Sequence, residues 1–141
     1  MRWNMLEMAE RDLETANILL ENFRKTNNER LFNNICYHIQ QCIEKSIKGM
    51  IDAMDVEFLF THSFYDLSEQ AIALYKDIND SGHILEILHD MMEKSVVYTP
   101  WESSTRYHDG FRSTINNIRM GISDCERCIE ACKMCGNLMN K

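Results

Sequence analysis

The sequence predicts an all-α fold, an up-and-down bundle of about five helices in which a four-helix core carries one further helix. Apolar residues recur every three or four positions over long stretches, which is the spacing of one face of a helix. The chain of 141 residues contains only one proline and five glycines, too few turn formers for an all-β protein. This length is typical of one domain, so we expect residues 1–141 to form a single helical domain.

The helix expected to organise the bundle lies between residues 34 and 54. Its apolar stripe consists of Ile35, Ile39, Ile43, Ile47, Met50 and Met54. A polar stripe about 100° round the helix consists of His38, Gln41, Lys45 and Lys48. One side of this helix is therefore predicted to face the core, while the neighbouring side offers imidazole, amide and ammonium groups.

The first and third helices are predicted from capping residues. Asn4, followed three residues later by Glu7, predicts a first helix over about 4–25. Ser63, followed by Asp66, predicts the start of the third helix, with Thr61 as a competing cap. The connection over 55–61 contains an apolar run, which we expect to pack under the bundle.

The last part of the chain predicts two helices separated by a loop. The fourth helix follows the turn at 79–82 and is expected to end at 96–100, because Pro100 disfavours a helical Thr99. Residues 100–110 form a long irregular connection, and loops of this length are often functional. The last helix begins near Phe111 and carries an apolar stripe as far as Cys132.

Composition limits the possible functions. The net charge is −7, so any phosphate site must be a local basic patch rather than a property of the whole surface. The chain has no apolar run long enough for a membrane helix and no signal-like N-terminus, so a cytoplasmic location without membrane contact is expected. Its six cysteines are then expected to be free thiols or ligands rather than disulfides.

Four stretches, in order along nearly the whole chain, resemble the HEPN domain family of nucleotide-binding helical bundles. They are residues 9–20, then the second-helix signature Tyr37, Gln40, Gln41, Glu44, Lys45 and Lys48, then Thr61-His62-Ser63 with Asp66-Leu67, then Thr105-Arg106-Tyr107. The third stretch is longer than the usual version, and His108 stands where the family often has proline. The resemblance implies a helical bundle, usually a homodimer, that binds a nucleotide or nucleic acid. It also implies a nucleotidyltransferase partner, as in paired toxin–antitoxin systems.

The first candidate site is a basic patch for phosphate. Lysines would act as point charges, Arg106 as a bidentate donor, and tyrosine rings or Trp101 could stack on a base. His62 lies near a predicted helix start, where backbone N–H groups favour an anion. The candidate residues are Tyr37, Gln41, Lys45, Lys48, His62, Arg106 and Tyr107. Two alternatives remain open. The lysines form i,i+4 pairs that are typical of a solvated helix face, and the Thr-Arg-Tyr turn could simply pin the loop to the bundle.

The second candidate is an RNA endonuclease. Many HEPN nucleases use an arginine and a histidine separated by four to six residues, so that the cation holds the phosphate and the imidazole moves protons. No arginine here has a histidine at that spacing. Arg106 and His108, with one residue between them, would be a degenerate version of the pair. We therefore predict no complete active site, and no cofactor is implied.

The third candidate is a metal or thiol site at Cys125, Cys128, Cys132 and Cys135. Two CxxC pairs are typical of zinc or iron–sulfur ligands. On one continuous helix, however, these four positions spread over about 15 Å of axis, too far for a single tetrahedral ion. Cys125 and Cys132 also fall on the apolar stripe. We therefore expect core or interface cysteines, with metal binding or a purely structural dimerisation module as the alternatives.

Overall fold

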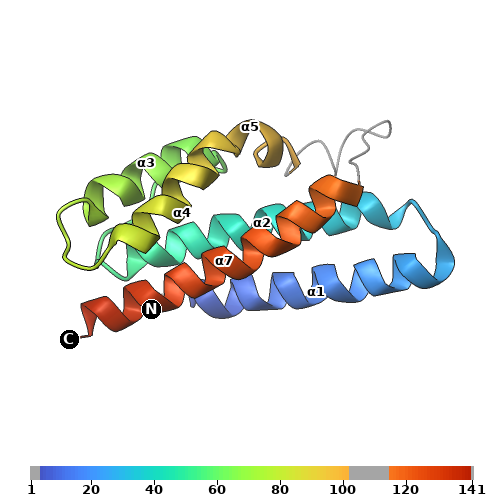
Figure 1. Ribbon diagram of the computed structural model, residues 1–141, viewed down its shortest axis with the longest axis horizontal. Helices are drawn as coiled ribbons and strands as arrows, with labels where there is room; N and C mark the ends of the chain where they lie inside the picture. Colours follow the sequence, from blue (N-terminus) through green and yellow to red (C-terminus); the bar gives the residue numbers. More distant parts are fainter. Residues whose placement is uncertain (1–3, 102–114, 141) are drawn as a thin grey trace.

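The computed structural model describes residues 4–101 and 115–140, and every regular element in these ranges is a helix. The helices are α1 (Met5–Thr26), α2 (Leu31–Asp52), α3 (Phe64–Tyr75), α4 (Gly82–Glu93), α5 (Ser95–Tyr98) and α7 (Ile115–Met139) (Figure 1). The prediction of an all-α bundle is confirmed. Within the described ranges, no helix is long and apolar enough to cross a membrane.

The core lies around α2, which packs against α1, α7 and α3. The predicted apolar stripe of α2 is fully buried from Ile35 to Met50, and Cys36 and Cys42 on neighbouring positions are buried as well. Met54 lies beyond the end of the helix and packs on the core from there. The three long helices α1, α2 and α7 pack on one another, and the shorter α3 and α4 lie against α2 and α7 (Figure 1).

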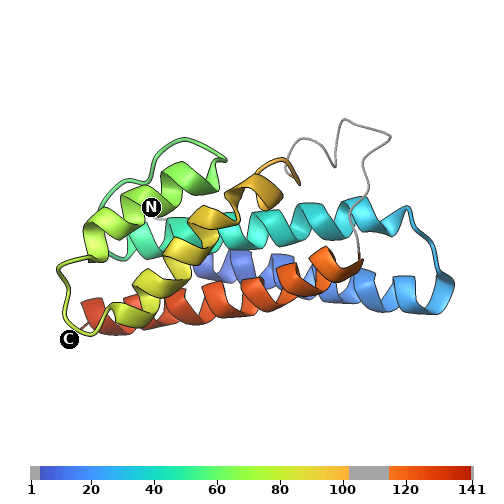
Figure 2. The same cartoon turned by 45° about the horizontal axis from the view of Figure 1, so that its top comes forward.

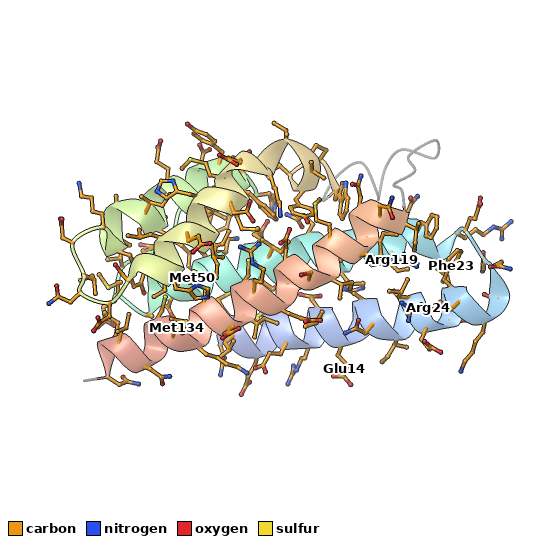
Figure 3. All side chains as sticks on the ribbon, viewed as in Figure 1. Glu14, Phe23, Arg24, Met50, Arg119 and Met134 are labelled. Carbon is orange, nitrogen blue, oxygen red and sulfur yellow. The ribbon has the colours of Figure 1, made fainter. Side chains whose placement is uncertain are left out.

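The connection between α2 and α3 runs back along α2 (Figure 2). The ring of Phe58 lies under the ammonium of Lys48, and His62 contacts Glu44, one turn earlier on α2. At the other end of α3, the hydroxyl of Tyr75 donates to the carbonyl of Met50 at 2.6 Å, beside the α3–α4 pair (Figure 3). Because of this returning connection, α3 runs in the same direction as α2 rather than antiparallel to it.

Two of the predicted helix starts are confirmed by their caps. The Oδ1 atom of Asn4 accepts a hydrogen bond from the backbone N–H of Glu7 at 3.1 Å. Ser63, rather than Thr61, caps α3, because its Oγ atom accepts from the backbone N–H of Asp66 at 3.3 Å. These bonds satisfy donors that a helix leaves unpaired at its first turn.

Three expectations were wrong in detail. The predicted fourth helix is divided into α4 and α5 at Lys94. Thr99 is helical, with φ −56° and ψ −43°, because its N–H closes the turn of α5 on the carbonyl of Ser95 despite the following proline. The 55–61 connection does not pack wholly under the bundle, since Leu59 is 48% and Phe60 105% exposed, and only its first part contacts the core. Residues 111–114, the expected start of the last helix, lie outside the described ranges.

Candidate functional site

The polar residues of α2 are joined by hydrogen bonds centred on Glu44, whose side chain is only 3% exposed. The carboxylate of Glu44 accepts from Nε2 of Gln40 at 3.0 Å, from Nζ of Lys48 at 3.1 Å and from Nδ1 of His62 at 2.8 Å. Gln41 extends this network by donating to Oε1 of Gln40 at 2.6 Å. A buried carboxylate requires hydrogen-bond donors, and these bonds provide donors for both oxygens of Glu44 inside the bundle.

A second carboxylate, Asp12 on α1, holds two further members of the polar stripe. Its two oxygens lie 2.8 Å from Nδ1 of His38 and 2.6 Å from Nζ of Lys45. Asp12 was missed by the sequence analysis, although a signal was present. It stands three residues after Ala9 and four before Ala16, on the buried stripe of α1, where a carboxylate requires a charged partner on the facing helix.

The two lysines therefore do not present isolated positive charges. Lys45 is paired with Asp12, and Lys48 with Glu44, and their side chains are 19% and 14% exposed. The i,i+4 pairing expected for Glu44 and Lys48 is present, but it is buried rather than part of a solvated face. Each ammonium has three N–H donors, and its carboxylate takes one of them, so the ion pair alone does not exhaust its capacity for an anion.

Both lysines line one pocket of about 290 Å³, which we call the lysine pocket. Its other described lining residues are Met5, Met8, Glu44, Phe58 and Phe60. The ammonium of Lys48 lies 5.1 Å from the centre of the Phe58 ring, a cation–π distance, and the Phe60 side chain is fully exposed at the rim. Phe58 and Phe60 were not among the sequence-predicted site residues, because their run was expected to be buried.

The other predicted site residues lie elsewhere or outside the described ranges. Tyr37 and Gln41 are not among the described residues that line the pocket. Trp101 is only 3% exposed, and the centre of its ring lies 5.1 Å from the centre of the Tyr98 ring. The suggestion that Trp101 stacks on a base was therefore wrong. Arg106, Tyr107 and His108 lie outside the described residues, and their roles stay predictions.

Comparison with known proteins agrees with the motifs and the fold. The family model of the HEPN domain matches residues 3–135, which covers nearly the whole chain, including all of α1 and α2. The chain belongs to the HEPN domain family. Neither the curated proteins nor the solved structures include a significant match to it.

A second buried network joins α4, α5 and α7 of this HEPN domain at Asp124, which is 2% exposed. The carboxylate of Asp124 accepts from the hydroxyl of Tyr98 at 2.6 Å, from Nζ of Lys94 at 3.0 Å and from Arg127 at 2.9 Å. The same two cations also contact Asp90, at 3.1 Å and 2.7 Å. Burial, reinforced by the Asp124 carboxylate, raises the pKa of Tyr98 far above its ordinary range, so its hydroxyl remains a donor.

The C-terminal cysteines of this HEPN domain belong to the core. Cys125, Cys128, Cys132 and Cys135 are all buried along one continuous helix, which confirms the core position predicted for Cys125 and Cys132. Burial raises the pKa of Cys132 to about 12 and that of Cys135 to about 11, so both side chains are protonated thiols at neutral pH in this packed core. Among the described residues, no group of three or more His, Cys, Asp or Glu side chains is placed to hold a metal ion.

Proposed function

We propose that this HEPN domain binds a nucleotide, or a short single-stranded end of a nucleic acid, in the lysine pocket. The observation that carries the proposal is the meeting of two ammonium groups and two phenyl rings at one pocket of about 290 Å³. A nucleotide needs both kinds of contact, because its phosphate is anionic and its base is a flat aromatic surface. This assignment keeps Lys45 and Lys48 from the sequence-based site and adds Phe58 and Phe60.

The phosphate end of the ligand would lie against the two lysines. Lysine binds phosphate as a point charge, and an anion here would share each ammonium with the carboxylate already paired to it. Because Asp12 and Glu44 balance the two lysines, the electrostatic gain is smaller than at an unpaired cluster. We therefore expect moderate affinity that falls with added salt.

The base end would stack on Phe60. Its side chain is 105% exposed, so it makes little contact within the described bundle, and stacking would remove apolar surface from water. Base–aromatic stacking contributes about 1–3 kcal/mol per base in other proteins and tolerates different bases. Phe58 is less suited to this role, because Lys48 already lies over its ring.

The charge of the chain favours a small ligand over a long one. The net charge of −7 repels an extended polyanion, and the pocket provides only two lysines among its described lining residues. A mononucleotide, or the terminal nucleotide of a strand, brings few phosphates and needs only this local patch. The proposed ligand is therefore a nucleotide rather than duplex nucleic acid.

The proposal also keeps the contributions implied by family membership. In this proposal, Arg106 and Tyr107 would complete the site from residues 102–114. Thr99 lies shortly before these residues, and its hydroxyl accepts a hydrogen bond at 3.2 Å from the backbone N–H of Phe64. Phe64 follows His62 by two residues, so this bond ties the end of α5 to the start of α3. A homodimer and a small nucleotidyltransferase partner, as in toxin–antitoxin pairs, are supported by the family alone. Light scattering of the purified chain, with and without a co-expressed nucleotidyltransferase, tests both.

Thermal unfolding against a panel of ATP, GTP, cyclic nucleotides and short RNA tests the binding proposal. A ligand at one hundred times its dissociation constant stabilises by about 2.7 kcal/mol, which for this size raises the midpoint by about 8 °C. Phe60→Ala and Lys48→Gln should each reduce the shift by about half or more. Leu59→Ala and Lys76→Gln are matched controls that should keep it, because these exposed side chains do not line the pocket. An equal shift in all four variants would contradict the assignment.

A second candidate function, RNA cleavage, is favoured by the contact between His62 and Glu44. The buried carboxylate holds Nδ1 as a donor, while the imidazole is 58% exposed, so Nε2 is the basic nitrogen of the neutral ring. Such a nitrogen can take the proton from a ribose 2′-hydroxyl as its oxygen attacks the phosphorus. The 5′ oxygen that leaves then needs a proton donor, the role that remains for His108, with Arg106 on the phosphate.

Cleavage of a labelled RNA by the purified protein tests this second function. If it is correct, wild-type protein cuts the RNA, His62→Asn lowers the rate at least about 100-fold, and His83→Asn, an exposed histidine on α4, leaves it unchanged. Absence of cleavage, or cleavage that survives both His62→Asn and His108→Asn, excludes this mechanism and leaves nucleotide binding as the proposed function.

A further inference from the structure

A groove of about 590 Å³ lies between α1 and α7, on residues that neither the lysine pocket nor the Asp124 network uses. It is lined by residues 10–18 of α1 and 126–133 of α7. In Figure 1 the two helices run in opposite directions and diverge toward the start of α7. The salt bridge between Glu10 and Lys133, at 3.7 Å, joins the helices at the end of the groove where they lie closer together.

The floor of this α1–α7 groove is apolar. Leu13 is half-buried, and Ile129 is 7% exposed at the line where the two helices meet. Ile18 lies at the edge of the groove and is 61% exposed. It is therefore not part of the face of α1 that is buried in the core, which carries Ala9, Ala16 and Leu20. An apolar strip of this kind gains stability only when a second apolar surface covers it.

The rim of the groove is acidic on both sides. Glu10 and Glu14 project from α1, and Glu126 and Glu130 from α7, and among the described lining residues only Lys133 carries a positive charge. All four glutamates are exposed, and Figure 3 shows Glu14 projecting from α1 on the side away from α3 and α4. The negative charge therefore flanks the apolar floor instead of covering it.

We propose that the α1–α7 groove docks an amphipathic helix of a partner protein, with an apolar stripe flanked by lysine and arginine. Helix-in-groove recognition places apolar side chains at i, i+3, i+4 and i+7 against the floor. Basic residues on both sides of that stripe would then face the two acidic rims, and long cationic side chains can extend from an apolar contact to a charged edge. The proposal does not depend on nucleotide binding.

The dimensions of the groove set the size of the docked segment. Residues 10–18 rise about 12 Å along α1, so the groove matches about two turns of a helix. Arg24 of α1 and Arg119 of α7 lie beyond these glutamates, nearer the end of the two helices where they diverge (Figure 3). A second copy of this chain is a poor occupant, because it would bring its own glutamates against these glutamates, and like charges across an interface oppose association.

A designed peptide serves as the probe for this proposal. It has about 15 residues, with leucines at i, i+3, i+4 and i+7 flanked by lysines, and a scrambled peptide of the same composition lacks the apolar face. Fluorescence anisotropy is measured with wild-type protein, with Glu126→Lys plus Glu130→Lys, and with Glu69→Lys plus Glu86→Lys. The last pair has the same charge change on exposed positions of α3 and α4.

The proposal predicts that the amphipathic peptide binds wild-type protein at least about tenfold more tightly than the scrambled one. The α7 double variant should lose at least about tenfold in affinity, while the α3–α4 double variant should change less than about twofold. Ile18→Ser, at an exposed position, should also weaken binding without lowering the unfolding midpoint. Equal binding of both peptides, equal loss in both double variants, or no binding would overturn the proposal.

Discussion

Replacing Asp124 with alanine should lower the stability of the bundle by about 3–4 kcal/mol. The variant removes the acceptor of the Tyr98 hydroxyl, which is completely buried, and an unsatisfied buried donor costs about 1–3 kcal/mol. It also removes one carboxylate from Lys94 and Arg127. Breaking a buried ion pair costs about 3–5 kcal/mol, but both cations keep Asp90, so the loss should lie near the lower end.

We therefore expect Asp124→Ala to lower the free energy of unfolding by about 3–4 kcal/mol, and the midpoint by about 10 °C. Urea titration followed by circular dichroism at the helix band measures this change. Two variants serve as controls. Asp124→Asn keeps an oxygen for Tyr98 and should lose less, while Asp90→Ala, at a position 28% exposed, should cost about 1 kcal/mol or less. A loss below about 1 kcal/mol for Asp124→Ala, or an equal loss for Asp90→Ala, would show that Asp124 is not the main polar anchor between α4, α5 and α7.

Three further predictions follow from packing, burial and charge. Gly121→Ala should lower the free energy of unfolding by about 1–2 kcal/mol, because the added Cβ would lie 2.7 Å from the buried Ile39 side chain. Gly136→Ala is the control on the same helix, and it should raise the free energy of unfolding by up to about 1 kcal/mol because its Cβ would meet open space. Urea titration measures both changes. The six buried cysteines should react with a thiol reagent only after unfolding, and rapid labelling of the native protein would contradict their burial. Burial tends to raise the pKa of Asp90, but hydrogen bonds from Arg127 and Lys94 outweigh this effect, so the pKa of Asp90 is lowered from its ordinary value. A carboxyl group with a lowered pKa contributes stability at pH values above its pKa in the unfolded chain, and this contribution is lost as the pH falls through its pKa in the folded protein. The stability difference between wild-type protein and Asp90→Asn should therefore shrink as the pH falls below about 4.

The helical bundle could be predicted because its signals are local. The three- and four-residue apolar repeat of α2 determines its buried face, and Asn4 and Ser63 mark helix starts by bonds to residues three positions away. The parallel direction of α2 and α3 could not be predicted in this way. It depends on the contacts of Phe58 and His62 with α2, and such contacts leave no periodic trace in the sequence.

The candidate site could be predicted only in part, for a similar reason. The polar stripe identified Lys45 and Lys48, but their partners differ in kind. Glu44 is local to α2, whereas Asp12 comes from another helix and is recognisable only as a carboxylate on a buried stripe. Phe60 was expected to be buried because it is apolar, and its exposure follows from the returning connection rather than from its residue type.

Nucleotide binding in the lysine pocket can be observed residue by residue in an NMR titration of isotope-labelled protein with ATP. Saturable chemical-shift changes are expected at Lys45, Lys48, Phe58 and Phe60, with small changes along the α1–α7 groove. Phe60→Ala should weaken the titration, while Leu59→Ala should not. Shift changes confined to other helices, or none at millimolar nucleotide, would contradict nucleotide binding in the lysine pocket.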